Sequence, residues 1–188
     1  MGLVCGRLAP PLDPSGLGDG TVACLPGWSA FRNECYRYFT STANYDTASS
    51  VCAGYNAAGT LVTIPDAATH NFVFQLGFGT SAFYIGLRDY SSSSWDGNYL
   101  TYAWADGTPY SFMMWRDGEP NSKDDRCVQM RNSHAHTGSG FPGSWDDIGC
   151  SILQAFMCQY PGAARPPSNA STGAARVGER HTYNSLSA

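Results

Sequence analysis

Three groups of oxygen-bearing side chains in the second half of the chain could together hold a metal ion. They are Glu119-Pro120-Asn121, Asp124-Asp125 and Asp146-Asp147. Carboxylate and amide oxygens are the hard donors that calcium selects. A cis peptide is essentially confined to proline, and one before Pro120 would let Glu119 and Asn121 reach the same ion. The pattern favours a calcium site, although acidic residues also occur in solvated turns that bind nothing.

No catalytic constellation accompanies these acids. A hydrolase needs a nucleophile beside a base, and the four histidines have no such context. Glycosidases use paired carboxylates, but a bound cation would neutralise Glu119, Asp125 and Asp147 rather than tune them as acids. His134 and His136 alternate and could share one strand face, yet no third zinc ligand accompanies them. We therefore expect a binding protein and not an enzyme.

Composition and charge narrow the class of protein further. The 188 residues suffice for one domain with extensions. Charged residues make up only 14%, the net charge is -4, and Lys and Arg form no cluster. Nucleic acid and anionic membranes are therefore not expected as partners. No stretch approaches the roughly 20 apolar residues that span a bilayer.

Seven cysteines without a CxxC pair predict disulfides rather than a zinc or thioredoxin-like site. Disulfides persist in oxidising compartments, so we expect a secreted, extracellular protein. Six cysteines can pair internally. Cys5, in an arm rich in Pro and Gly, is the odd one and the candidate for an interchain disulfide that would make a homodimer.

The chain divides into three parts by composition. Residues 1–22 read as an irregular N-terminal arm, residues 23–160 as one dense domain, and residues 161–188 as a flexible tail. Helical spacing predicts a helix over residues 46–55, capped by Asn44, and a second over residues 69–76.

Short aromatic and apolar runs predict the strands of the domain. Residues 88–121 show no regular period, and so long a loop inside a compact domain is usually functional. The sequence therefore predicts an α+β domain with two helices, short antiparallel strands and a long irregular loop region. The expected strands cover residues 28–39, 61–64, 83–87, 127–131, 144–147 and 155–160.

Residues 24–160 resemble a C-type lectin domain in several motifs that occur in the family's order. Tyr84-Ile85-Gly86-Leu87 stands where the family has Trp-Ile-Gly-Leu, and Trp115, Gly118-Glu119-Pro120-Asn121 and Trp145-Asp146-Asp147 follow. The resemblance implies that fold. It also implies three disulfides, of which the first marks the long form of the domain: Cys24–Cys35, Cys52–Cys158 and Cys127–Cys150.

The resemblance also implies that one principal calcium ion bridges the protein to two vicinal hydroxyls of a sugar. Glu-Pro-Asn is similar to the motif of mannose-type members, which take equatorial 3- and 4-hydroxyls. Glu119 can only accept a hydrogen bond and Asn121 can donate one, so the pair fixes how a hydroxyl must point. By position, the implied ligands of the ion are Glu119, Asn121, Asp125, Asp146 and Asp147.

Two residues depart from the family's pattern. Asp146 stands where the family usually has Asn, which removes a hydrogen-bond donor and adds a negative charge. A sugar hydroxyl would then face two acceptors, Asp125 and Asp146. Mannose-type and galactose-type sugars both stay open, since some Glu-Pro-Asn members bind galactose. Arg126 stands where an auxiliary calcium site would have an acid, so we expect that second site to be absent.

Residues 131–144 form a longer link than usual in the family, in which Phe141 or a histidine could stack on a sugar ring. A surface loop without such a role is the alternative for this segment. We expect a calcium-dependent lectin that binds mono- or oligosaccharides on glycans, with a role such as innate immunity or adhesion. The alternative is a structural or surface-binding protein on the same fold, of the ice-binding or biomineral-matrix kind. Displacement by free sugar would separate the two.

Overall fold

The computed structural model describes residues 22–80, 82–90, 101–122, 124–131 and 141–164. Within these ranges the chain has the predicted α+β composition, with α1 Tyr45–Tyr55 and α2 Ala67–Leu76. Neither helix is long and apolar enough to cross a membrane. The strands are β1 Val22–Ala23, β2 Ser29–Phe31, β3 Glu34–Ala43, β4 Thr60–Leu61, β5 Phe83–Asp89, β6 Tyr102–Trp104, β7 Cys127–Met130, β8 Trp145–Ile148, β9 Gln154–Pro161 and β10 Ala163–Ala164.

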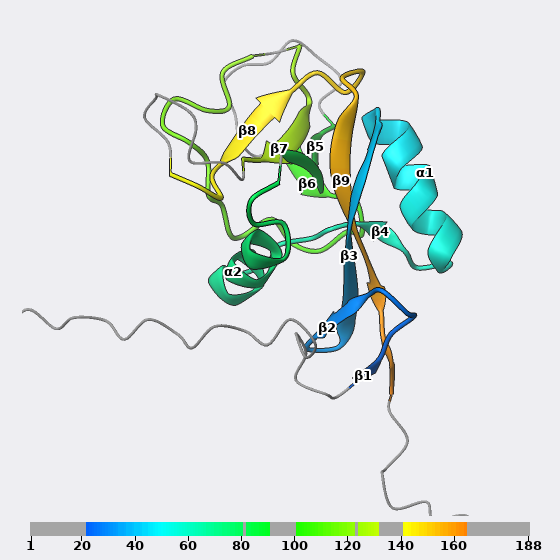
Figure 1. The fold of residues 1–188 in the computed structure, drawn as a ribbon. Coiled ribbons are helices and arrows are strands. Elements are labelled where there is room, and N and C mark those ends of the chain that lie inside the picture. The colour runs from blue at the N-terminus through cyan, green and yellow to red at the C-terminus, as the bar shows by residue number, and fades with distance from the viewer. Residues whose placement is uncertain (1–21, 81, 91–100, 123, 132–140, 165–188) are drawn as a thin grey trace, which may run out of the picture.

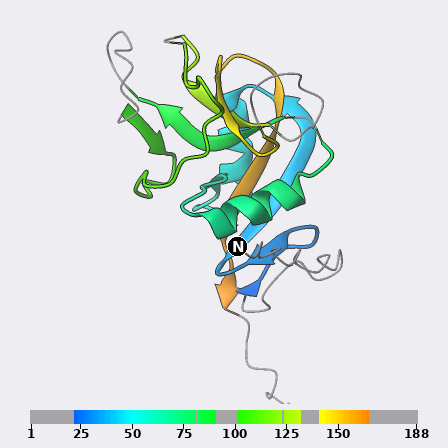
Figure 2. The same ribbon diagram turned by 90° about the vertical axis from the view of Figure 1, so that its left-hand side faces the viewer.

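The long antiparallel pair of β3 and β9 forms the spine of the molecule. Figure 1 shows α1 and α2 on opposite sides of this pair, and Figure 2 shows α2 crossing in front of it. The main sheet continues in the order β2-β3-β9-β5-β7-β8, with β4 added on β9 and β6 on β5. The contact of β5 with β9 is parallel, whereas β5–β7 and β7–β8 are antiparallel. The acidic residues of the last strands therefore lie on β8, at one edge of this sheet.

Polar side chains start both helices. Oδ1 of Asn44 accepts from the N–H of Thr47 at 2.9 Å, which confirms the predicted cap of α1. Oδ1 of Asp66 accepts from the N–H of Thr69 at 2.8 Å, so α2 begins two residues before the predicted start at Thr69. The caps satisfy backbone donors that the first turn of a helix leaves unpaired.

One strand inside the predicted irregular loop region was missing from the prediction. Residues 88–121 were expected to be irregular, but β6 lies within them and pairs with the end of β5, where Leu87 opposes Trp104 and Asp89 opposes Tyr102. Tyr102 and Trp104 are buried while Ala103 between them is exposed. Three residues are too few to reveal a period of two in the sequence, which is why the strand escaped prediction.

Paired backbone runs past both predicted boundaries of the domain. Val22 pairs with Ala164 and Ala23 with Ala163 in a small two-stranded sheet. The folded part thus includes residue 22 and residues 161–164, because β1 and β10 satisfy each other's backbone groups. The rest of the predicted arm, with Cys5, and the rest of the predicted tail lie outside the described residues.

The three disulfides in the described part of the chain are the pairs that the resemblance implied. They are Cys24–Cys35, Cys52–Cys158 and Cys127–Cys150. The last joins the start of β7 to the turn that follows β8. It therefore lies next to the strand that carries Asp146 and Asp147.

The segment Tyr84-Ile85-Gly86-Leu87 is the buried part of β5, the strand that pairs with β7 in the main sheet. Its three side chains are fully buried, and a Cβ at Gly86 would lie 2.6 Å from the carbonyl oxygen of Leu61, so no side chain fits there. The hydroxyl of Tyr84 lies 2.9 Å from the carbonyl oxygen of Gly149 and 2.8 Å from that of Ile152. The core strand thus fixes the turn after β8.

Candidate metal and ligand site

A segment without regular structure runs beside β8 and carries Glu119 toward it. Trp115 and Trp145 form a parallel bridge. The N–H of Trp145 donates to the carbonyl of Met114 at 2.7 Å, and the N–H of Arg116 donates to the carbonyl of Trp145 at 2.9 Å. The fully buried Trp145 ring packs edge-on against Trp115 and is thereby part of the core. This pairing sets the position of the residues that follow.

The chain then turns sharply at the Glu-Pro-Asn motif. Gly118 has a φ of 85°, a backbone conformation that is strained for any residue with a side chain. The N–H of Glu119 donates to the carbonyl of Arg116 at 3.0 Å and closes the turn. The Glu119–Pro120 peptide is cis, the conformation considered for it from the sequence. Pro120 is buried and Asn121 is exposed.

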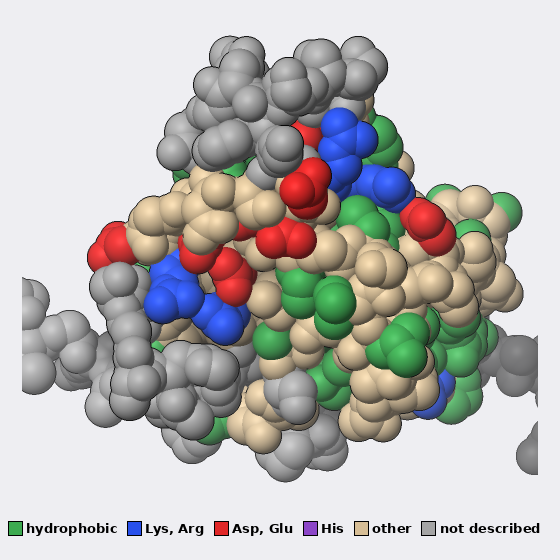
Figure 3. Space-filling view, turned by 90° about the horizontal axis from the view of Figure 1, so that it is seen from above, with side chains coloured by type: hydrophobic (Ala, Val, Ile, Leu, Met, Phe, Trp, Pro, Cys, Tyr) green, Lys and Arg blue, Asp and Glu red, His purple; other side chains and the backbone are tan. Residues whose placement is uncertain are grey.

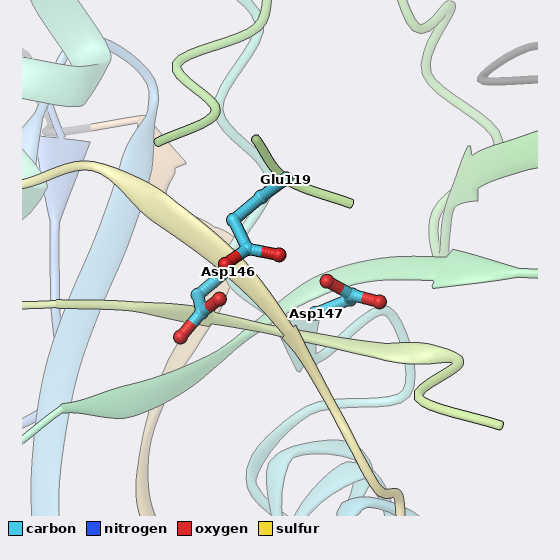
Figure 4. Close-up of side chains that lie close together, drawn as sticks. All are labelled: Glu119, Asp146 and Asp147. Carbon is cyan, nitrogen blue, oxygen red and sulfur yellow. The ribbon is translucent and has the colours of Figure 1, made fainter. Parts of the chain in front are cut away.

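Three carboxylates converge at this turn. One oxygen each from Glu119, Asp146 and Asp147 lies within 4.8 Å of the others. Asp146 and Asp147 are buried and Glu119 is partly buried. Figure 4 shows Glu119 reaching toward β8 from its own segment, with Asp146 and Asp147 on either side of the β8 ribbon. The structure thus brings together three of the five predicted ligands.

Asp147 holds the loop that follows the motif. Its Oδ1 accepts from the N–H of Asn121 at 3.1 Å, and its Oδ2 accepts from the N–H of Ser122 at 3.0 Å. Hydrogen bonds to a charged acceptor are stronger than neutral ones. The carboxylate therefore both contributes charge to the cluster and positions the backbone beside Glu119.

Asp146 also contacts residues that the sequence did not identify. Its Oδ2 accepts from Nε2 of Gln129 at 3.1 Å and lies 3.2 Å from Nη1 of Arg131. Gln129 is held in turn by Nε2 of Gln154, which donates to its Oε1 at 2.8 Å. These contacts follow from the register of β7 and β8, in which Gln129 lies opposite Asp146. The sequence alone does not reveal that register.

The electrostatics of the cluster fit a cation. Burial raises the pKa of Glu119 to about 8, and the neighbouring carboxylates of Asp147 and Asp146 add to the shift. The buried Oε2 of Glu119 has no hydrogen-bond donor among the described residues. Carboxylates crowded in this way repel one another, and a divalent cation with a preference for oxygen would remove that repulsion.

The remaining predicted ligands and contacts are not among the carboxylates of this cluster, although the backbone N–H of Asn121 donates to Oδ1 of Asp147. Asp125 is not one of the three clustered carboxylates. Its Oδ1 lies beside Gly149, 3.4 Å from where the Cβ of a larger residue at that position would be. The side chain of Asn121 is exposed. Phe141 is 48% exposed in the turn before β8. His134 lies outside the described residues, as does His136.

Acidic and basic side chains alternate over this end of the molecule. Figure 3 shows Asp and Glu side chains next to Lys or Arg side chains on the face seen from above. Nε of Arg126 lies 3.9 Å from the buried Oδ2 of Asp89. A guanidinium thus stands where the resemblance would place an acid of an auxiliary metal site, and the absence of that site remains a prediction.

The comparisons with known proteins agree on one family. Residues 41–160 match the Lectin C-type domain. The chain is 31% identical over 142 residues to an alpha-N-acetylgalactosamine-specific lectin of Patiria pectinifera, covering 71% of this chain and 78% of that protein. It is 27% identical over 139 residues to the human C-type lectin domain family 17, member A, covering 73% of this chain but only 32% of that protein.

Solved structures agree with the sequence relatives. The C-type lectin domain of murine dendritic cell inhibitory receptor 2, solved in complex with N-glycan, superposes with a TM-score of 0.62 and 27% identity. The likeness covers 74% of this chain and 99% of that domain. With the fold, the disulfides and the family match on the same residues, this chain belongs to the C-type lectin domain family.

Proposed function

We propose that this chain is a lectin that binds carbohydrate through one calcium ion, and that it has no catalytic activity. The observation that carries the proposal is the convergence of Glu119, Asp146 and Asp147 on one point, where a buried oxygen of Glu119 finds no donor among the described residues. The guanidinium of Arg131 contacts Asp146 through the Oδ2 that Gln129 also uses, and among the described residues no ion pair is made by Glu119 or Asp147.

The proposed ligands of the ion combine the cluster with two residues of the neighbouring loops. Glu119, Asp146 and Asp147 supply carboxylate oxygens, and Asn121 and Asp125 join them by their places in the family's motifs. When bound, calcium in this family takes two vicinal sugar hydroxyls as further ligands. The chain's own contribution is to hold the carboxylates together, which the bridge to Trp145 and the bonds to Asp147 accomplish.

The donors and acceptors of the site determine how the sugar hydroxyls must be oriented. Glu119 and Asp146 only accept when ionised, whereas the amide of Asn121 also donates. A hydroxyl beside Asn121 can therefore both donate and accept, while a hydroxyl beside Asp146 must donate. Glu-Pro-Asn favours mannose-type sugars in our proposal, and a galactose-type sugar is the second candidate because the Patiria pectinifera relative is named for N-acetylgalactosamine.

The proposed setting is extracellular. Three disulfides on a chain of this size are typical of secreted domains. A single sugar site of this kind binds weakly, so useful avidity needs several sites on one particle. A homodimer linked through Cys5 would provide two, and such a protein could recognise glycans in innate immunity or adhesion.

Retention on immobilised sugars tests the proposal. The whole chain is passed over mannose and galactose columns in calcium, and then eluted with a chelator. Retention on either sugar that the chelator abolishes supports the proposal. If calorimetry showed that the chain binds calcium but neither sugar column retained it, the lectin proposal would be contradicted. That result would favour a structural or surface-binding role.

A further inference from the structure

Gln129 and Arg131 reach the same oxygen of Asp146 from one side of the sheet. Gln129 lies directly opposite Asp146 in the β7–β8 pair, and the pairing continues through the N–H of Arg131, which donates to the carbonyl of Ser144 at 2.9 Å. Side chains alternate along an extended strand, so residues 129 and 131 project to the same face. Arg131 is then a diagonal neighbour of Asp146.

Both side chains use Oδ2 of Asp146. Nε2 of Gln129 is 3.1 Å from this oxygen and Nη1 of Arg131 is 3.2 Å from it. Oδ1 is engaged by neither of them. A carboxylate held in this way resembles an amide, because one oxygen is left for a cation while the guanidinium offsets the extra charge.

Arg131 is not the only residue that holds Asp146 in place. Gln129 is 6% exposed and is anchored by Gln154 at 2.8 Å. The backbone of Asp146 is paired within β8. Loss of the guanidinium should therefore change the charge around Asp146 more than its position.

We infer that Arg131 is the charge-compensating partner of Asp146, and that the pair sets how strongly the cluster binds its cation. This inference rests on the proposed calcium site. Replacing Arg131 leaves the three carboxylates with one more uncompensated negative charge, which attracts a divalent cation more strongly. Replacing Asp146 by a neutral amide leaves the guanidinium facing the cation, which weakens binding. Replacing both residues leaves the net charge around the cation the same as in the wild type.

A double-mutant cycle measured by calcium calorimetry on the whole chain tests the pair. The four proteins are the wild type, Arg131→Gln, Asp146→Asn and the double variant. We expect the calcium affinity of Arg131→Gln to rise about tenfold, that of Asp146→Asn to fall about tenfold, and that of the double variant to lie within about threefold of the wild type. The Coulomb energy between Arg131 and the cation sets these magnitudes.

A matched control and a second readout separate charge compensation from a structural role. Arg32→Gln removes the same charge from the exposed pair with Asp66 and should leave calcium affinity unchanged. Metal-stripped Arg131→Gln should unfold at a lower temperature than the stripped wild type, and calcium should raise its unfolding temperature by more. A merely structural Arg131 would lower both unfolding temperatures equally.

The outcomes are distinct. Weaker calcium binding by Arg131→Gln would overturn the inference, as would a double variant whose affinity remains about tenfold below that of the wild type. Either result leaves the proposed function standing, provided that the wild type binds calcium. A wild type that binds no calcium would overturn the proposed function and this inference together.

Discussion

The backbone N–H of Asn121 donates to Oδ1 of Asp147 at 3.1 Å, so that a loop residue and a strand residue 26 positions apart are joined through one carboxylate. The second oxygen of Asp147 accepts from the N–H of Ser122. Asp147 therefore holds the loop after Pro120 on β8 while its charge adds to the cluster. The geometry around Glu119 depends on this link.

Asp147→Asn should weaken both functions of the residue. An amide has one oxygen, so it can accept from only one of the N–H groups of Asn121 and Ser122, and the free energy of unfolding should fall by about 1 kcal/mol. Calcium affinity should fall at least tenfold because a full negative charge is lost. Chemical denaturation and calcium calorimetry measure the two effects. Asp117→Asn changes an exposed acid in the same segment, and an equal effect there would contradict the assignment.

The raised pKa of Glu119 predicts how stability depends on pH. In the folded chain that pKa is about 8, above its ordinary value of 4.5. A carboxyl that holds its proton more tightly when folded makes the protein less stable as pH rises between these values. Metal-stripped protein should thus unfold at a lower temperature at about pH 8.5 than at about pH 6.5, whereas Glu119→Gln should lose this difference.

Calcium should also remove the pH effect, because the ion favours the ionised form of Glu119. Burial lowers the pKa of His70, and this shift is common to the wild type and Glu119→Gln, so it cancels in their comparison. Calorimetry or thermal unfolding of protein stripped on a chelating resin makes the comparison. If the wild type and Glu119→Gln showed the same pH dependence, Glu119 would not carry the shift.

The fold was largely predictable from the sequence because its signals are local. Asn44 is a helix cap next to a helical pattern, and the cis proline lies between Glu119 and Asn121. The site was predictable only in part. Arg131 and Gln129 contact Asp146 through the register of β7 and β8. This register is tertiary geometry that the spacing of residues does not encode, and the role of Asp125 as a ligand stays a prediction.

The disulfide between Cys127 and Cys150 should support the site as well as the fold. It closes a loop with a sequence separation of 23, and its removal by Cys127→Ala with Cys150→Ala should cost about 3 kcal/mol of stability. Calcium affinity should also fall, because the bond fixes the turn after β8. Removing Cys24–Cys35 in the same way should lower stability while leaving calcium affinity unchanged. Equal losses of affinity would contradict a local role.

Phe141 is predicted to contact the sugar and not the ion. Its ring is 48% exposed before β8, and stacking on a sugar face would bury apolar surface. Phe141→Ala should weaken sugar binding roughly fivefold, as expected for about 1 kcal/mol, with calcium affinity unchanged. Phe78→Ala removes a similarly exposed ring just after α2 and should have no effect. Unchanged sugar affinity in Phe141→Ala would remove this residue from the site.

Anomalous diffraction from crystals of the whole chain grown in calcium tests the central claim most directly. We predict one strong anomalous peak with carboxylate oxygens of Glu119, Asp146 and Asp147 around it. The same peak should be weaker in crystals of Asp147→Asn grown at the same calcium concentration. A map without a peak at this cluster, or with calcium bound only at other acids, would contradict the account.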